Sequence, residues 1–161
     1  MNEQNAAAIA MVMALPSEGR GNLLPQIYAA MGRYNEAADA LLAMNSGLIL
    51  RGMVEEAARL LRTAPAKAAS PQTLPRLGVL EFVYLYIGAS NRVLEFDEGN
   101  VEAGYSASAI TAFLWHPSYA TVRKTEHFKA FVRKAGLVDY WRAKGWPQWC
   151  HPTTATDFVC E

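Results

Sequence analysis

The residues best suited to nucleophilic or metal chemistry are two cysteines and three histidines. Cys150 and His151 are adjacent near the C-terminus, whereas His116, His127 and Cys160 stand apart in the chain. A catalytic nucleophile needs a base oriented by a third group, and a structural zinc site needs closely spaced pairs of ligands. Neither pattern occurs in the sequence. We therefore expect no catalytic residue, no metal ion and no cofactor, and we predict that the chain is not an enzyme.

The densest basic stretch lies in the C-terminal third, where it could in principle meet phosphates. Glu126 stands three residues from both Arg123 and Lys129, where helical neighbours pair, so the stretch is interpreted as a solvated outer face. Nucleic acid is accordingly disfavoured as a partner. Arg123 is instead expected to tie the turn after Pro117 to a carboxylate or a helix end. The stretch comprises Arg123, Lys124, Lys129, Arg133 and Lys134.

Composition sets the class of protein. The 161 residues carry fifteen Lys plus Arg and fifteen Asp plus Glu, so no net charge favours nucleic acid or an anionic membrane surface. With 52% hydrophobic residues, the chain is predicted to fold as one ordered domain over residues 1–161. The longest apolar stretch, Leu77–Ala89, contains Glu81 and is shorter than the roughly 20 residues that span a bilayer, so it is interpreted as a buried helix. Because Met1–Ala14 lacks the charge order of a secretory signal, we expect a cytoplasmic protein without membrane contact.

The two cysteines are too few and too close together for a disulfide scaffold. Reduced thiols are the favoured interpretation, and whether Cys150 and Cys160 pair is left open. Residues 146–161 are expected to form a C-terminal tail that is loose after Trp149. Within this tail, Trp146–Trp149 is expected to fold back as an apolar clasp over an open hairpin edge.

Helical periodicity dominates the elements that position these residues, and no strand-like alternation competes with it. The sequence predicts an all-α fold of about eight to nine helices. A loop at 63–75, rich in proline, is predicted to lie between two halves of one domain. The predicted helices cover approximately 6–13, 24–31, 35–45, 54–62, 77–87, 91–96, 101–112, 128–135 and 138–141.

Two segments share one spacing of apolar and small residues. Leucine and tyrosine four residues apart lie on one helix face, glycine allows a tight turn, and a small residue five positions later lets a second helix approach closely. The segments are Leu24, Tyr28, Gly32, Ala37, Leu41 and Leu80, Tyr84, Gly88, Val93, Asp97. This pattern resembles the tetratricopeptide repeat, a helix-turn-helix unit. The resemblance implies a short α-α superhelix of stacked hairpins.

A second resemblance covers residues 113–150, which contain Phe113-Leu114-Trp115-His116-Pro117, Gly136-Leu137-Val138-Asp139-Tyr140-Trp141 and Gly145-Trp146-Pro147. This run is similar to the C-terminal end of tetratricopeptide-like regions that follow winged-helix DNA-binding or nucleotide-cyclase domains in bacterial signalling proteins. The resemblance implies a non-catalytic sensing or protein-interaction module. Its output domain would lie N-terminal to the module. Whether Met1 is the native start or such a domain precedes it stays open.

Two functions follow as hypotheses. The first is a protein- or peptide-binding module of a bacterial signalling or transcription system, because stacked hairpins offer an extended surface to a partner. The alternative is a small-molecule sensor whose pocket is lined by the aromatic residues of the C-terminal half. The identity of the partner and the oligomeric state, including a homodimer, are left open. The expected partner-binding residues are Tyr28, Tyr84, Tyr105, Trp115, Arg123 and Trp141.

Overall fold

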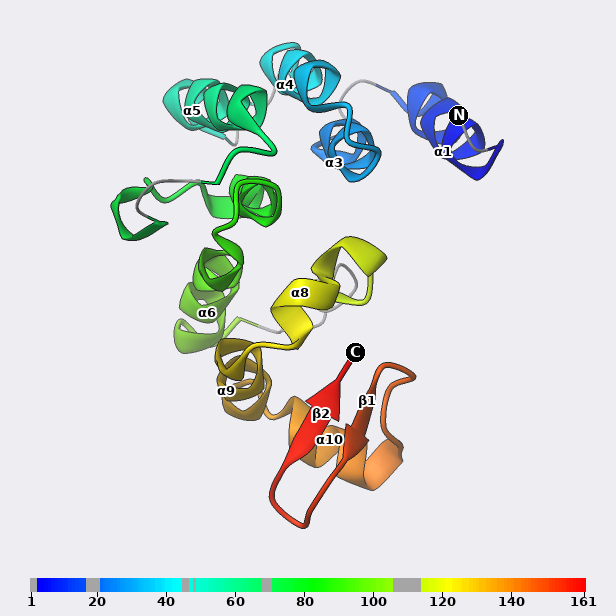
Figure 1. Ribbon diagram of the computed structural model, residues 1–161, viewed down its shortest axis with the longest axis vertical. Helices are drawn as coiled ribbons and strands as arrows, with labels where there is room; N and C mark the ends of the chain where they lie inside the picture. The colour runs from blue at the N-terminus through cyan, green and yellow to red at the C-terminus, as the bar shows by residue number, and fades with distance from the viewer. Residues whose placement is uncertain (1–2, 17–20, 45–46, 48, 68–70, 106–113) are drawn as a thin grey trace. The chain divides into compact units, whose positions relative to one another are not determined.

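The computed structural model describes residues 3–16, 21–44, 47, 49–67, 71–105 and 114–161. Within these ranges the fold is helical apart from one short pair of strands, which confirms the predicted all-α class (Figure 1). The chain forms two compact units, Met1–Ala89 and Ser90–Glu161. The loop predicted at 63–75 lies within the first unit.

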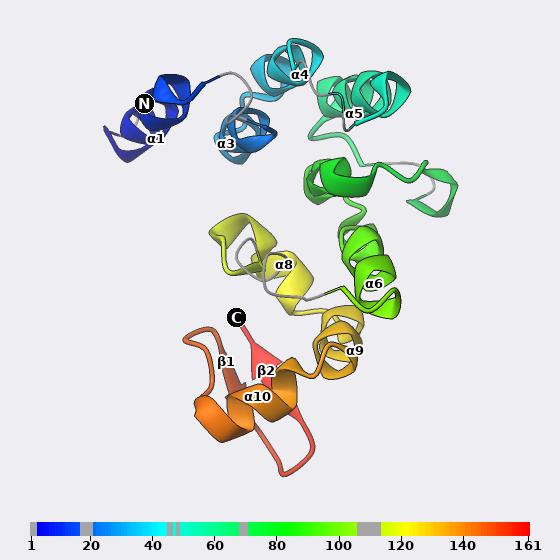
Figure 2. The ribbon, with the colours of Figure 1, turned by 180° about the vertical axis from the view of Figure 1, so that it is seen from behind.

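In the first unit the described α-helices pack one against the next, and the last of them packs on a 3₁₀ helix. Figure 2 shows the same succession of α3, α4 and α5 from behind. Four predicted helices are confirmed here, with bounds that differ by a few residues. Helix α1 (Glu3–Ala14) packs on α3 (Leu23–Ala30), α3 on α4 (Tyr34–Leu42), α4 on α5 (Arg51–Thr63), and α5 on the 3₁₀ helix η2 (Gly78–Leu85), while η1 (Pro71–Thr73) lies between the last two in sequence.

Small side chains let these helices approach one another. Ala37 and Ala38 of α4 and Ala57 and Ala58 of α5 are all buried. Each alanine contributes a methyl group and loses no side-chain rotamer freedom on burial, so neighbouring helices can pack closely at these positions. Larger apolar residues fill the rest of this layer, chiefly Leu41, Leu60, Leu61, Leu77, Leu80 and Val83.

The α3–α4 hairpin matches the predicted Leu24–Leu41 segment. Gly32 adopts a φ of +73°, a left-handed conformation that glycine reaches without the steric penalty of a side chain. This turn allows the backbone amide of Arg33 to donate to the carbonyl of Tyr28 at 2.9 Å, which closes the end of α3. The spacing of leucine, tyrosine, glycine and alanine therefore does specify a helical hairpin at this place.

The second copy of the spacing folds differently. The predicted α-helix at 77–87 is wrong in type, because Gly78–Leu85 form a 3₁₀ helix. Leu77, Leu80 and Val83 are all fully buried and recur every three residues. A 3₁₀ helix has three residues per turn and places such a row on one face, whereas an α-helix would rotate it away. The three-residue row is compatible with the tighter helix, and Phe82 and Tyr84 beside it are buried as well.

The second unit combines short helices with a terminal hairpin of strands. The predicted helices at 128–135 and 138–141 are confirmed within α9 and α10, whereas the helix predicted at 101–112 falls mostly outside the described residues. No described helix combines the length and apolar character needed to cross a membrane. The elements are η3 (Ser90–Arg92), α6 (Glu95–Glu102), η4 (Pro117–Tyr119), α8 (Ala120–Arg123), α9 (Glu126–Lys134), α10 (Leu137–Lys144), β1 (Cys150–Pro152) and β2 (Phe158–Cys160).

The expectation of a loose tail with reduced thiols is wrong. Strands β1 and β2 pair antiparallel, with Cys150 opposite Cys160, and a disulfide joins the two cysteines. Phe158, between the cysteines in this hairpin, is fully buried. The tail is ordered because Phe158 supplies an apolar anchor and the disulfide closes the ends of the hairpin. Both views show this hairpin beside α10 (Figure 1).

Because Ala38 is fully buried in α4, the Ala38→Leu variant is expected to overpack the first unit and to lower its free energy of unfolding by about 1–3 kcal/mol. Urea denaturation followed by circular dichroism measures this change. Ala30→Leu, at an exposed position in α3, is the matched control and should stay close to the wild type. Equal stability of the two variants would contradict close packing at Ala38.

Candidate functional site

A surface of aromatic rings and one arginine lies at the turn of the α3–α4 hairpin. The guanidinium carbon of Arg33 lies 4.7 Å from the ring centroid of Tyr28, and the rings of Tyr34 and Tyr86 are 5.7 Å apart at 53°. All four side chains are half-buried. Arg33 and Tyr34 are consecutive, so the two contacts are adjacent along the chain. We call Tyr28, Arg33, Tyr34 and Tyr86 the tyrosine surface.

The local sequence fixes these four positions. Gly32 reverses the chain and puts Arg33 directly before the first residue of α4. Arg33 is also held by hydrogen bonds to the carboxylate of Glu36, one turn along the helix, which lower the pKa of Glu36. Tyr86 follows the buried row of η2 at its three-residue spacing. Each ring or guanidinium is thus held in place by the helix or turn on which it stands.

The six residues expected to bind a partner are divided between the two units and differ in exposure. Tyr28 belongs to the tyrosine surface, but Tyr84 is fully buried and donates its hydroxyl hydrogen to the carbonyl of Pro75. Tyr105 follows α6 and is 69% exposed. Trp115 is half-buried, and Trp141 is buried. Among the six, Tyr84, Trp141 and Arg123 therefore serve the interior of the described structure.

The aromatic residues of the second unit pack against one another. Trp141 is at the centre of this aromatic cluster, with its ring centroid 5.8 Å from that of Trp115, 5.7 Å from Trp146 and 6.1 Å from Phe158. Trp146 also lies 5.5 Å from Phe158. Tilted and edge-on arrangements of this kind add to the stabilisation from burial alone. The rings that the sensor hypothesis assigned to a pocket are thus in contact with each other.

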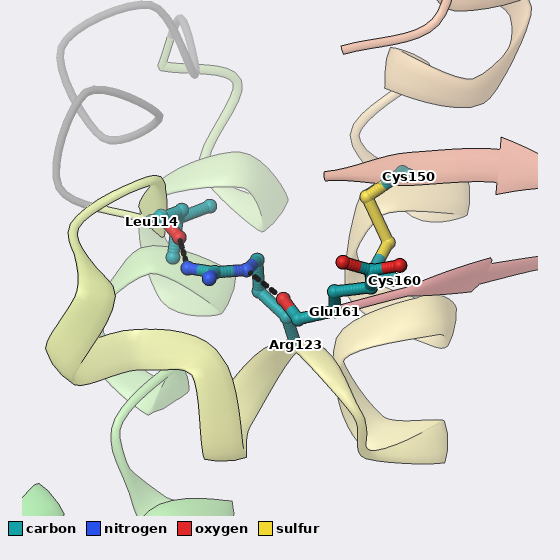
Figure 3. Close-up of a disulfide and its surroundings, with 5 residues drawn as sticks. All are labelled: Leu114, Arg123, Cys150, Cys160 and Glu161. Carbon is teal, nitrogen blue, oxygen red and sulfur yellow. Dashed lines mark hydrogen bonds between the residues drawn. A yellow bond between two sulfur atoms is a disulfide. The ribbon is translucent and has the colours of Figure 1, made fainter. Parts of the chain in front are cut away.

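Arg123 is the buried polar centre of the second unit. Its side chain is nearly inaccessible to water, at 2% exposure. Nη1 donates to the carbonyl oxygens of Leu114 at 2.7 Å and His116 at 3.0 Å, and Nε donates to the backbone oxygen of Glu161 at 2.7 Å. Figure 3 shows the bonds to Leu114 and Glu161, next to the disulfide. Arg123 does have a structural task, but the expected partners were wrong: it binds main-chain oxygens of Leu114, His116 and Glu161 rather than a side-chain carboxylate or a helix end.

The charge of Arg123 also affects its neighbours. Burial lowers the pKa of Arg123, but arginine stays cationic in proteins. Burial, together with this nearby positive charge, lowers the pKa of His116. A neutral imidazole can accept a hydrogen bond, and Nδ1 of His116 accepts one from the backbone amide of Ser118 at 3.3 Å. His116 therefore caps the turn at η4.

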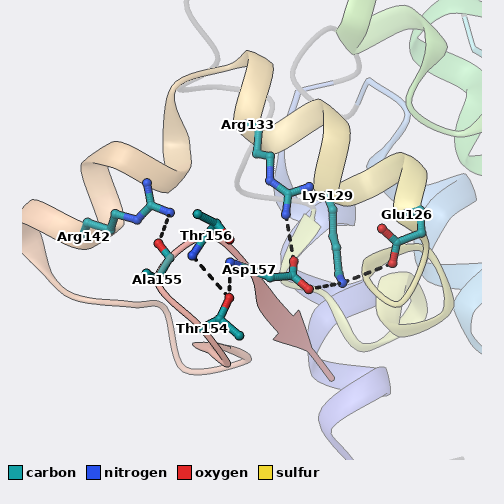
Figure 4. Close-up of polar contacts among 8 residues, drawn as sticks. All are labelled: Glu126, Lys129, Arg133, Arg142, Thr154, Ala155, Thr156 and Asp157. Carbon is teal, nitrogen blue, oxygen red and sulfur yellow. Dashed lines mark hydrogen bonds and ion pairs between the residues drawn. The ribbon is translucent and has the colours of Figure 1, made fainter.

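The loop between β1 and β2 is held by polar contacts (Figure 4). The carboxylate of Asp157 accepts hydrogen bonds from Arg133 at 2.8 Å and Lys129 at 3.4 Å. A hydrogen bond from the backbone of Phe158, followed by those from Lys129 and Arg133, lowers the pKa of Asp157. Arg142 of α10 donates to the carbonyl of Ala155 at 3.1 Å. These basic residues of the second unit thus hold the hairpin.

A row of ionisable groups joins α6 to α9. Nε2 of His127 lies 2.6 Å from Oε1 of Glu98, and Nζ of Lys134 lies 2.5 Å from Oε1 of Glu102. Asp97 lies beside Glu98 on α6. Burial, and secondarily the charge of Glu98, raises the pKa of Asp97 to about 6. The carboxylate of Asp97 is therefore the least favourable charge in this row at neutral pH.

The groups considered for catalysis lie in separate contacts. The sulfur of Cys150 is bonded to Cys160, His116 caps a turn, and His127 faces Glu98. In the ranges that the structure describes, no group of three or more histidine, cysteine, aspartate and glutamate side chains is arranged to hold a metal ion.

The Arg123→Ala variant is expected to lose at least about 1–3 kcal/mol of stability, because it leaves the buried carbonyl of Leu114 without its donor and also removes the hydrogen bonds to His116 and Glu161. Thermal and urea unfolding measure the change. Lys124→Ala, the exposed neighbour, is the control and should have little effect. A small effect at Arg123 would show that these bonds do not hold the unit together.

The Asp97→Asn variant is expected to raise the melting temperature at pH 7.5. Because burial raises the pKa of Asp97 from its ordinary value of 3.8 to about 6 in the folded state, the folded protein binds the proton more tightly than the unfolded chain. The loss of folding stability caused by the charged Asp97 carboxylate is therefore complete above pH 6, and it disappears as the pH falls toward 4. Melting temperatures measured between pH 4 and 7.5 test this, with the exposed Asp139→Asn as the control. A pH-independent difference would contradict the assignment.

Comparisons of the chain with protein-family models, with curated proteins and with solved structures found no match. The resemblance of residues 24–41 and 113–150 to tetratricopeptide-like regions therefore stays a prediction from the residues themselves. The tyrosine surface and the Arg123 centre are interpreted from their own geometry.

Proposed function

We propose that this chain is a non-catalytic protein-interaction module whose first unit binds a segment of a partner protein at the tyrosine surface. The observation that carries the proposal is that two aromatic contacts, Tyr28–Arg33 and Tyr34–Tyr86, involve consecutive residues at the α3–α4 turn. Tyrosine and arginine are enriched among the residues that dominate binding energy in protein interfaces. A tyrosine ring also has few rotatable bonds, so it loses little conformational entropy when it is covered.

The way in which the surface is supported favours binding. The rings and the guanidinium are half-buried, which means that the protein already orients them while part of each stays accessible. Preorganised side chains lose less freedom when a partner arrives, and more of the contact energy appears as affinity. The hydrogen bonds between Arg33 and Glu36 contribute to this order. The carboxylate of Glu36 also neutralises the charge of Arg33, so the tyrosine surface suits a largely uncharged segment of a partner.

The packing order of the first unit supports a tetratricopeptide-like superhelix as the scaffold. Helices α1, α3, α4 and α5 each contact the next in this order, and α5 contacts η2, as in solenoid proteins, where extended surfaces bind peptides or partner helices. The resemblance of residues 113–150 supports a place in a bacterial signalling or transcription system. Both units are electrically balanced, which favours a protein over nucleic acid as the partner.

The test uses the immobilised full-length chain to capture proteins from nuclease-treated lysate of the source cells. A captured protein is then purified, and its affinity for the chain is measured by calorimetry. The Tyr28→Ala/Tyr34→Ala variant should bind it at least tenfold more weakly, since losing about 1.4 kcal/mol of contact energy corresponds to a factor of ten.

The matched control is Tyr105→Ala/Tyr140→Ala, which removes two exposed tyrosines of the second unit. It should leave affinity unchanged, and circular dichroism should show that both double variants stay folded. Equal binding by the wild type and the Tyr28→Ala/Tyr34→Ala variant would overturn the assignment of the tyrosine surface. Loss of binding in the Tyr105→Ala/Tyr140→Ala variant alone would overturn it as well.

A further inference from the structure

We propose that the docking of the terminal hairpin, residues 150–160, depends on the oxidation state of Cys150 and Cys160. In the disulfide state the hairpin covers the aromatic cluster. In the dithiol state it separates from the cluster and leaves Trp141 and Trp146 accessible. The second unit thus contains a redox-sensitive cover that is independent of the tyrosine surface.

The hairpin has little stability of its own. Its two strands contain three residues each, and an isolated two-stranded hairpin is marginal in water. Phe158 is its only large apolar side chain that is fully buried, whereas His151, Pro152 and Val159 are exposed. One aromatic anchor must therefore offset the conformational entropy lost by the whole segment.

The polar contacts of the hairpin add little to this anchor. Asp157 and Arg133 are both more than two-fifths exposed, and exposed ion pairs contribute little net stability. Lys129 is less exposed but divides its contacts between Asp157 and Glu126. These contacts orient the loop once it is docked. They do not replace a covalent constraint on its ends.

The disulfide supplies that constraint. Cys150 and Cys160 face each other in the strand register and close a loop with a sequence separation of 10. Such a bond restricts the undocked chain and so favours the docked state. When the bond is reduced, the restriction disappears, and Phe158, the exposed polar contacts of the loop and the hydrogen bond from Arg123 to Glu161 are left to oppose undocking.

Undocking of the hairpin also changes the contacts of Arg123. Glu161, next to Cys160, accepts a hydrogen bond from Nε of Arg123, and its amide donates to the carbonyl of Trp149 at 2.8 Å. The ring of Trp149 lies 5.8 Å from the guanidinium carbon of Arg123. Opening the hairpin removes these partners from a buried cation. The oxidation state of the cysteines therefore also affects Leu114 and His116, whose carbonyls accept hydrogen bonds from the same guanidinium.

The chemistry is a two-electron thiol–disulfide exchange with a dithiol reductant. Its thiolate attacks the sulfur of Cys160, the more exposed of the two cysteines, and displaces the thiolate of Cys150. The second thiol of the reductant then attacks the mixed disulfide and releases Cys160. The protein gains two thiols, whose protons come from the reductant, and the reductant becomes a cyclic disulfide. A disulfide oxidant such as oxidised glutathione reverses the exchange.

The test uses dithiothreitol as the probe on the full-length chain, with free thiols counted by a chromogenic thiol reagent. All four tryptophans lie in the second unit, so their emission reports on the cover. Reduction should yield two titratable thiols, a shift of the emission to longer wavelength and stronger quenching by acrylamide. Tryptic cleavage after the exposed Arg142 and Lys144 should become at least about tenfold faster, because cleavage follows the population of the open form.

The Cys150→Ser/Cys160→Ser variant should resemble the reduced protein with or without dithiothreitol, which separates the effect of the bond from that of the reagent. A Phe158→Ala variant that keeps the disulfide tests whether the anchor alone decides docking, and it should be cut more slowly than the serine variant. The proposal is overturned if two thiols titrate while emission, quenching and cleavage stay unchanged, or if no thiol forms without a denaturant.

Discussion

A guanidinium that is nearly removed from water must find acceptors, and in the second unit this requirement decides how three separate segments are arranged. Arg123 brings the carbonyls of Leu114 and His116 together with the backbone of Glu161, which is distant from them in sequence. The planar, fork-like group has five N–H donors, so one side chain can serve all three. The end of the hairpin, the turn at η4 and helix α8 therefore share a single polar centre.

The first unit is organised by the opposite kind of contact. Buried alanines on α4 and α5 permit close helix packing without any buried charge at these positions. The tyrosines then fall where the packed layer ends, at the α3–α4 turn and after η2. A ring at such a place has one side supported by protein and another side accessible. The same close packing that stabilises the helices thus creates a surface suited to binding.

Much of the helical architecture could be predicted because amphipathic spacing and glycine turns are local signals. Gly32 and the Leu24–Leu41 spacing are examples, and Arg123 was expected to hold a turn. The 3₁₀ helix at 78–85 was missed because an apolar run of this kind fits both helix types. The hairpin was missed because its strands are too short to show alternation, although two cysteines flanking an aromatic residue were a signal. Tyr34 and Tyr86 were missed because their proximity arises only in the folded chain.

The buried row of η2 has a consequence for how this chain can change in length. Leu77, Leu80 and Val83 repeat with the period of the helix itself, so inserting one residue would turn everything after it by about 120°. Such an insertion would move the following side chains out of the core and displace Tyr86 from Tyr34. Inserting three residues would add one full turn and keep the row intact. Related sequences should therefore vary in length here in steps of three residues, a pattern of gaps that helices of the α type do not impose.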